Sequence, residues 1–173
     1  MRHAFLIIAH NNWNQLKKLI RLLDAENHDI YIHIDKKSKD FNKKEFLNIT
    51  RKSKLYIFQE YEVFWGGFSQ VQVEIYLFEK AHALKYDYYH LISGADLPLK
   101  SNKEIDAFFE QHRGTEFILY DEDKLKNDPE ITRRAKYYHF LQNYRRRYTQ
   151  KWKNGFFTFL ERVSLVAQIV FRV

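Results

Sequence analysis

Short apolar runs alternate along this chain with segments of helical spacing, and this alternation most constrains its fold. Residues 4–9 form an unbroken apolar run, which is typical of a strand buried on both faces of a parallel sheet. Residues 12–23 then place apolar side chains at intervals of three and four, as an amphipathic helix does. The same alternation predicts strands at 29–34, 55–58, 88–92 and 116–120, and helices at 41–49, 67–84 and 102–111.

Strands joined by helices of this length predict an α/β fold, with a mostly parallel sheet covered by helices on both faces. We expect residues 1–124 to form this α/β subdomain. Residues 125–173 are basic and aromatic, with a strand at 133–140 and an amphipathic helix at 156–173. Because that helix reaches Val173 without a cap or a polar tail, we expect the fold to be incomplete at the C-terminus and the native chain to continue.

Composition excludes several kinds of active site. The chain has no cysteine, which excludes disulfides, thiol catalysis and cysteine-bound metals. Its histidines show no zinc-binding spacing, so we predict no metal site. Neither a P-loop nor a Gly-x-Ser-x-Gly elbow is present, and no apolar run is long enough to cross a membrane.

A formal charge of +7 favours an anionic partner, such as a diphosphate, a nucleic acid or an acidic lipid surface. Tyrosines and arginines gather at residues 137–148, where they would suit phosphate contacts and base stacking. A basic nucleic-acid-binding α/β domain is therefore one alternative function, and a non-catalytic membrane-surface module is another. No known nucleic-acid motif accompanies the charge, so we predict no nucleic acid partner.

Parallel sheets bind ligands beyond the carboxyl ends of their strands, and Asp35 stands at such an end. Its carboxylate could accept hydrogen bonds from a uracil imide or a ribose hydroxyl. The alternative is a helix cap or an ion pair with Lys36 or Lys37.

Two glycine-containing turns provide further candidates. Trp65-Gly66-Gly67 places a flat ring and free backbone amides before a helix, where a ligand or an anion could approach closely. Its alternative is a buried tryptophan at a tight turn. Asp96, which follows the strand at 88–92, is a candidate for contact with a sugar, and its alternative is a turn held by its own side chain.

Asp121 and Asp123 form an Asp-x-Asp pair after the strand predicted at 116–120. Such pairs can hold a divalent metal and a diphosphate, so Mn²⁺ binding here is a minor alternative. Acidic matches of three residues are common by chance, and we expect no metal cofactor.

Four stretches, read in order, resemble the core-2/I-branching glycosyltransferase family, which includes the peptide O-xylosyltransferases. They are Phe5-Leu6-Ile7-Ile8-Ala9-His10, Tyr31-Ile32-His33-Ile34-Asp35-Lys36-Lys37-Ser38, Trp65-Gly66-Gly67-Phe68-Ser69, and residues 90–102 with Ser93-Gly94-Ala95-Asp96-Leu97-Pro98. The resemblance covers about residues 3–120, with order and spacing preserved. It is nearer to the xylosyltransferase branch and to bacterial members than to the animal GlcNAc branching enzymes.

The resemblance implies a GT-A-like fold and an inverting, metal-independent enzyme. The donor would be a UDP-sugar carrying GlcNAc or xylose, and the acceptor a hydroxyl of a glycan or a lipid-linked glycan. Asp35 would match the family's uracil-contacting acid, and His10 would border the nucleotide. Trp65 and Gly66 would line the donor pocket, and Asp96 would sit near the sugar.

One element of the family pattern is missing. The family's general base is a glutamate in a Pro-Asp-Glu or Pro-Ala-Glu stretch of its second half, whereas Asp128-Pro129-Glu130 has another order. We therefore assign no catalytic residue, expect the base beyond Val173, and interpret this chain as the donor-binding half. The resemblance also suggests polysaccharide biosynthesis in the cytoplasm, and it leaves peripheral contact with the inner face of the cell membrane open.

Overall fold

The computed structural model describes residues 1–118, 121–122, 127–129, 131, 137–139 and 151–171. The chain divides into two compact units. The first unit contains residues 1–63 and 68–114, and the second contains residues 64–67 and 115–173. Within the described residues, every helix is too short or too polar to cross a membrane.

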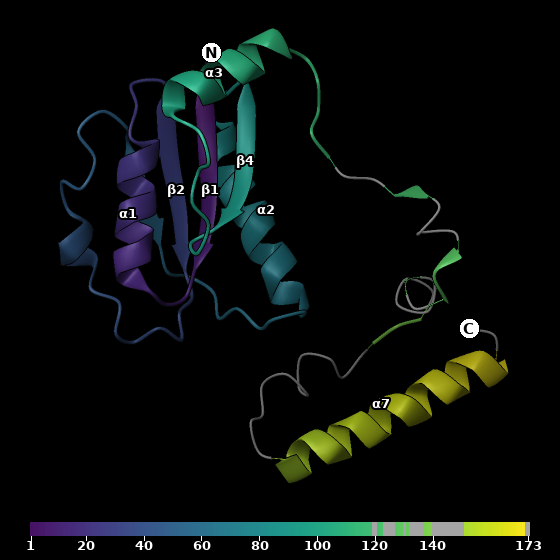
Figure 1. Ribbon diagram of the computed structural model, residues 1–173. Helices are drawn as coiled ribbons and strands as arrows, with labels where there is room; N and C mark the ends of the chain where they lie inside the picture. The colour runs from purple at the N-terminus through teal and green to yellow at the C-terminus, as the bar shows by residue number, and fades with distance from the viewer. Residues whose placement is uncertain (119–120, 123–126, 130, 132–136, 140–150, 172–173) are drawn as a thin grey trace. The chain divides into compact units, whose positions relative to one another are not determined.

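A four-stranded parallel sheet forms the centre of the first unit (Figure 1). The strands are β1 (His3–Ala9), β2 (His28–Ile34), β3 (Leu55–Phe58) and β4 (Tyr88–Ser93), in the order β3-β2-β1-β4. β1 lies in the middle of this order, with His3 opposite both His28 and Tyr88. The predicted α/β class is thereby confirmed, and the sheet is consistent with a GT-A-like fold.

Helices cover both faces of the sheet, as the sequence predicted. α1 (Trp13–Leu23) packs on one face, and α2 (Phe68–His82) packs on the other. α3 (Asn102–Gln111) lies across the amino ends of the strands in Figure 1 and begins with a capping box between Ser101 and Glu104. The core on the α1 face consists of Phe5, Ile7, Ala9, Leu16, Leu19, Ile20, Leu23, Ile30, Ile32, Ile34 and Phe46.

α2 buries a different stripe from the one that its spacing suggests. Spacing alone favours a face with Val71, Ile75, Phe78 and Ala81 or His82. Of these only Ala81 is buried, and it shares the face against the sheet with Val73 and Leu77. Because the helix carries apolar residues on more than one side, its sequence fits two faces and only packing selects between them.

Two other predicted elements differ from the structure. The helix predicted at 41–49 is reduced to a single 3-10 turn, η1 (Lys43–Phe46), around the buried Phe46. No strand includes residues 116–118, where Phe117 and Ile118 stay exposed, and residues 119–120 lie outside the described part. An apolar pair cannot form a strand unless a neighbouring strand provides its hydrogen bonds.

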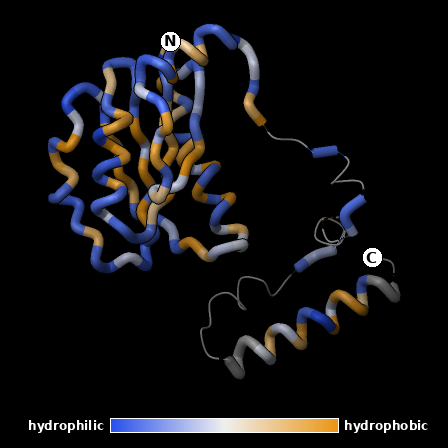
Figure 2. Tube along the Cα trace, in the orientation of Figure 1, coloured by the Kyte–Doolittle hydropathy of each residue, from blue (hydrophilic) through white to orange (hydrophobic). Residues whose placement is uncertain are grey.

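The second unit contains α7 (Lys151–Phe171), which confirms the predicted C-terminal helix through residue 171. Figure 2 shows polar and apolar residues interspersed along it. The Gln168 amide pairs with the Tyr138 backbone, accepting from its N–H at 2.8 Å and donating to its carbonyl at 3.0 Å. Residues 137–139 are not in a strand. The rest of the predicted 133–140 strand and the predicted boundary after residue 124 lie outside the described residues.

Candidate functional site

The carboxyl edge of the sheet brings several predicted site residues to one side of the first unit. His10 follows β1, Asp35 follows β2, and Asp96 lies in the turn after β4. The β1–β2 connection crosses one face through α1, whereas the β3–β4 connection crosses the other through α2 (Figure 1). The chain therefore reverses its winding direction at β1, and ligands of open parallel sheets bind beside such reversals.

Asp35 organises this edge from a nearly buried position, with only 6% of the residue exposed. Its Oδ1 accepts hydrogen bonds from the backbone N–H of Lys37 at 2.9 Å and of Val63 at 3.2 Å. Its Oδ2 lies 3.4 Å from the Lys37 ammonium, so the ion pair considered as an alternative does form. The Asp35 N–H donates to the Ala9 carbonyl at 2.8 Å. One residue thus connects the end of β1, its own loop and the segment after β3.

Further hydrogen bonds tie the loops of this edge together. The Ser38 hydroxyl donates to the His10 carbonyl at 2.6 Å. The Gln59 amide donates to the carbonyls of Ser38 at 3.1 Å and Asp35 at 3.4 Å. Sequence analysis assigned no role to Ser38 or Gln59, although the polar turn after Asp35 was a visible signal for Ser38. The His10 side chain itself is exposed at the edge.

His33 is a second organiser that sequence reasoning missed. It is fully buried in β2, and its Nε2 accepts from the Tyr61 N–H at 3.1 Å. Burial lowers the pKa of His33 to about 4, against the opposing influence of Asp35 and Glu60. The ring is therefore neutral near pH 7, and it holds the segment after β3 against the sheet. Alternation along β2 puts His33 on the face opposite Ile30 and Ile32, and no sequence motif marks this role.

The turn after β4 depends on Asp96 and Gly94. Asp96 Oδ2 accepts from the Ser93 N–H at 2.7 Å, and the Asp96 N–H donates to the Ser93 carbonyl at 3.0 Å. The side chain thus holds its own turn, as the alternative interpretation expected, while the residue stays exposed. A Cβ on Gly94 would lie 2.6 Å from the Ala9 Cβ, so only glycine lets this turn approach β1.

Trp65 and Gly66 belong to the second unit, whereas His10, Asp35 and Asp96 belong to the first. Gly66 has a φ of 67°, a left-handed conformation that favours glycine. The Gly67 N–H closes the turn onto the Phe64 carbonyl at 2.9 Å. The Trp65 residue is 77% exposed, which does not fit the alternative of a buried tryptophan.

Metal-binding residues are not gathered at the carboxyl edge in the described part of the chain. Asp121 is exposed, and Asp123 lies outside the described residues, so their Mn²⁺ site stays a prediction. Among the described residues, the one group of three or more suitable side chains is His3, His28 and Asp106, at the amino edge.

Comparisons with known proteins relate most of the chain to one family. The family described as "Core-2/I-Branching enzyme" matches residues 3–165. Xylosyltransferase 2 from Canis lupus familiaris and from Homo sapiens is in each case 27% identical over 126 residues, and xylosyltransferase 1 from Homo sapiens is 25% identical over 126 residues. Each alignment covers 68% of this chain but only 13% or 14% of the relative, so the chain spans a small part of these relatives.

Proposed function

The chain belongs to the core-2/I-branching enzyme family, and on this premise we propose that it binds the nucleotide-sugar donor of a glycosyltransferase. The donor is a UDP-sugar carrying GlcNAc or xylose. The acceptor is a hydroxyl group of a glycan or a lipid-linked glycan. The reaction inverts the anomeric carbon and requires no metal.

The observation that best supports this proposal is the position of Asp35. It ends β2 at the edge where parallel sheets bind ligands, and its carboxylate is held by two backbone N–H groups. Both of those bonds go to Oδ1. Oδ2 has the Lys37 ammonium 3.4 Å away and would accept from the uracil imide or a ribose hydroxyl. A carboxylate positioned before the ligand arrives loses little freedom on binding.

The other predicted residues take complementary roles in this proposal. His10 borders the nucleotide from the end of β1, and Asp96 contacts the sugar from the turn after β4. Trp65 offers a ring for stacking, and Gly66 lets the backbone approach the donor closely.

In the proposed reaction, the acceptor hydroxyl oxygen attacks the anomeric carbon and the bond from that carbon to the UDP oxygen breaks. A carboxylate takes the hydroxyl proton, and cationic groups stabilise the negative charge of the departing UDP. Lys37 is a candidate for that charge because its ammonium already lies beside Asp35. We assign the proton-accepting role to no residue of this chain.

The test is a calorimetric titration of the 173-residue chain with UDP in EDTA, repeated with Mn²⁺. Asp35→Asn is the informative variant, because asparagine keeps an oxygen for the two backbone N–H groups and removes the charge. Asp24→Asn is a matched control, since Asp24 also accepts backbone N–H bonds, from Arg51, Lys52 and Ser53, but at the opposite edge.

We expect UDP to bind in EDTA, about 10-fold more weakly to Asp35→Asn, with the Asp24→Asn affinity unchanged. Binding only with Mn²⁺ would contradict metal independence and direct attention to Asp121 and Asp123. A folded chain that ignores UDP would contradict the proposal. Binding of RNA that weakens steeply with added salt would then favour the nucleic-acid alternative, and binding of acidic vesicles the membrane-surface one.

A further inference from the structure

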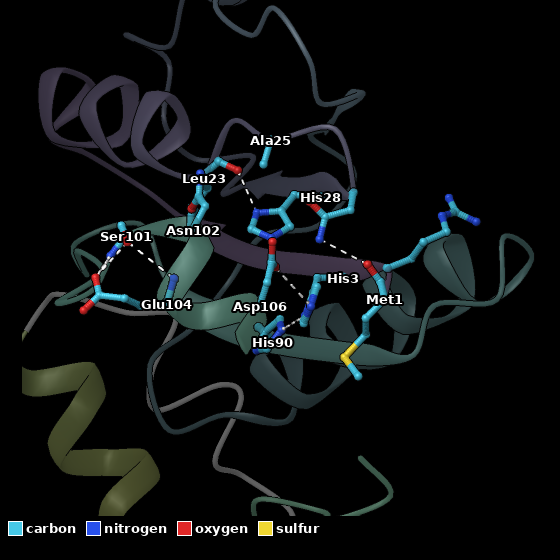
Figure 3. Close-up of polar contacts among 12 residues, drawn as sticks. Met1, His3, Leu23, Ala25, His28, His90, Ser101, Asn102, Glu104 and Asp106 are labelled. Atoms are coloured by element: carbon cyan, nitrogen blue, oxygen red, sulfur yellow. Dashed lines mark hydrogen bonds and ion pairs between the residues drawn. The ribbon is translucent and has the colours of Figure 1, made fainter. Parts of the chain in front are cut away.

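A buried cluster of histidines and one carboxylate occupies the amino edge of the sheet (Figure 3). His3 and His28 begin β1 and β2, lie opposite each other in the register, and are fully buried. Asp106 reaches them from α3, with its Oδ1 2.9 Å from His28 Nε2 and 3.4 Å from His3 Nε2. His90 in β4 completes the cluster, with its Nε2 2.9 Å from His3 Nδ1.

The hydrogen bonds of His28 decide where its proton lies. Its Nδ1 is 2.9 Å from the Leu23 carbonyl, which can only accept, so Nδ1 carries a hydrogen. In the neutral ring, Nε2 then directs a lone pair at Asp106 Oδ1, which is also an acceptor. Two acceptors at 2.9 Å repel each other unless a proton or a cation lies between them.

His3 presents the same situation from the neighbouring strand. Its Nδ1 bonds with His90, while its Nε2 is buried without a hydrogen-bond partner and faces the same carboxylate oxygen. The ligand atoms of His3, His28 and Asp106 all lie within 4.8 Å of one another. Two buried imidazole nitrogens and one half-buried carboxylate oxygen thus lie near a common point.

This donor set suits zinc. Zinc bonds of about 2.0–2.1 Å in a tetrahedron place neighbouring ligand atoms about 3.3 Å apart. The contacts of 2.9 and 3.4 Å to Asp106 bracket that separation. Histidines that bind zinc through Nε2 donate their other N–H to a second group. Leu23 and His90 occupy those outer positions for His28 and His3.

We propose that His3, His28 and Asp106 form a zinc site that fastens α3 to the amino ends of β1 and β2. Asp106 keeps 33% of its side chain exposed, so a water molecule can reach the fourth position of the ion from that side. The site lies at the edge opposite the proposed nucleotide site, and it does not depend on the proposed function. Spacing in the sequence missed it because each ligand comes from a different element.

The experiment adds Zn²⁺ to the metal-free 173-residue chain in competition with a chromophoric chelator, and records the melting temperature with and without the ion. Asp106→Asn and His28→Gln remove ligands, His90→Asn removes an outer partner, and His82→Gln is the control because His82 lies exposed on α2. We expect one zinc ion per chain and a raised Tm for the wild type and His82→Gln. Affinity should fall about 10–100-fold in His90→Asn and further in the two ligand variants.

Because loss of a buried ligand can also unfold the chain, the wild type is loaded separately with Co²⁺. A visible spectrum typical of tetrahedral nitrogen and oxygen ligands is expected. A wild-type chain that binds no zinc, or whose Tm is indifferent to it, would overturn the proposal and leave a proton between His28 and Asp106. Equal zinc affinity in the wild type and both ligand variants would overturn it as well.

Discussion

The two edges of the sheet differ in where their polar side chains lie and in what these side chains bond to. At the carboxyl edge, the polar side chains lie in loops and bond mainly to backbone. Asp35 accepts from two N–H groups, Asp96 accepts from Ser93, and Ser38 donates to a carbonyl. Each of these bonds shapes a turn that leads away from a strand.

At the amino edge, Asp24 also bonds to backbone, but several buried polar side chains begin strands and bond to other side chains. His3 pairs with His90, and His28 with Asp106. Asp29 accepts from the Tyr86 hydroxyl at 2.6 Å. Buried polar groups of this kind are costly when one partner is removed. We therefore expect substitutions at the amino edge to reduce stability, and substitutions at the carboxyl edge to affect mainly ligand binding.

Asp29→Ala should have the largest effect on stability. It would leave the Tyr86 hydroxyl and the Lys54 N–H, now 2.6 and 3.0 Å from the carboxylate, without that partner. Burial, together with Asp29, raises the pKa of Tyr86, so its hydroxyl stays protonated and must donate. We expect unfolding in urea to show a loss of about 3 kcal/mol.

The control for this variant is Lys100→Ala, which removes a solvent-exposed ion pair with Glu104 and should leave the free energy of unfolding almost unchanged. Equal losses of stability in the two variants would contradict the expected difference between the edges, because a substitution at the amino edge would then cost no more than one at a solvent-exposed surface.

Gly94→Ala should cost about 1–3 kcal/mol, because its Cβ would overlap with Ala9 and force β4 away from β1. Gly155→Ala is the matched control. Within the described part of the chain, an alanine Cβ at this position would meet nothing outside its own helical turn within 4 Å, and alanine favours a helix over glycine by about 1 kcal/mol. The same urea experiment measures both. A Gly94→Ala variant as stable as the wild type would show that the carboxyl edge is less tightly packed than its distances imply.

His33 tests whether buried ionisable groups at the carboxyl edge also contribute to stability. Its native pKa of about 4 lies below its unfolded value, so the unfolded state binds more protons between these two values. Its contribution is fully present near pH 7 and is lost as pH falls toward 4. We expect His33 to contribute about 1 kcal/mol to the loss of stability between about pH 7.5 and about pH 5.5 in EDTA, beside the contributions of His3 and His90, and this part should be missing in His33→Gln. An unchanged slope in that variant would locate the pH dependence elsewhere.

Local patterns were sufficient to predict strands β1 to β4 and helices α1, α2 and α3 of the first unit. They also predicted most of α7 in the second unit. The apolar run of β1, the capping box of α3 and the glycine turn after β4 each act within a few residues, so the sequence displays them directly. The positions of His10, Asp35 and Asp96 at one edge followed from the parallel arrangement alone.

Properties that depend on distant segments were not visible. The buried side of α2 depends on which stripe meets the sheet, and η1 depends on how Phe46 enters the core. The histidine cluster requires the register between β1 and β2 and the position of α3 across them. Asp35 was singled out as a ligand contact, but its two bonds to the backbone became apparent only in the folded chain.

The central place of β1 has a consequence for how the protein is synthesised. β1 emerges from the ribosome before the other three strands of this sheet, yet one of its edges is completed only when β4 pairs with it in register, Ile8 with Ser93. Until then, an apolar strand presents unpaired N–H and C=O groups to any other chain. Translation that stops or slows before Ser93 should therefore favour aggregation, whereas release of the complete β4 closes that edge.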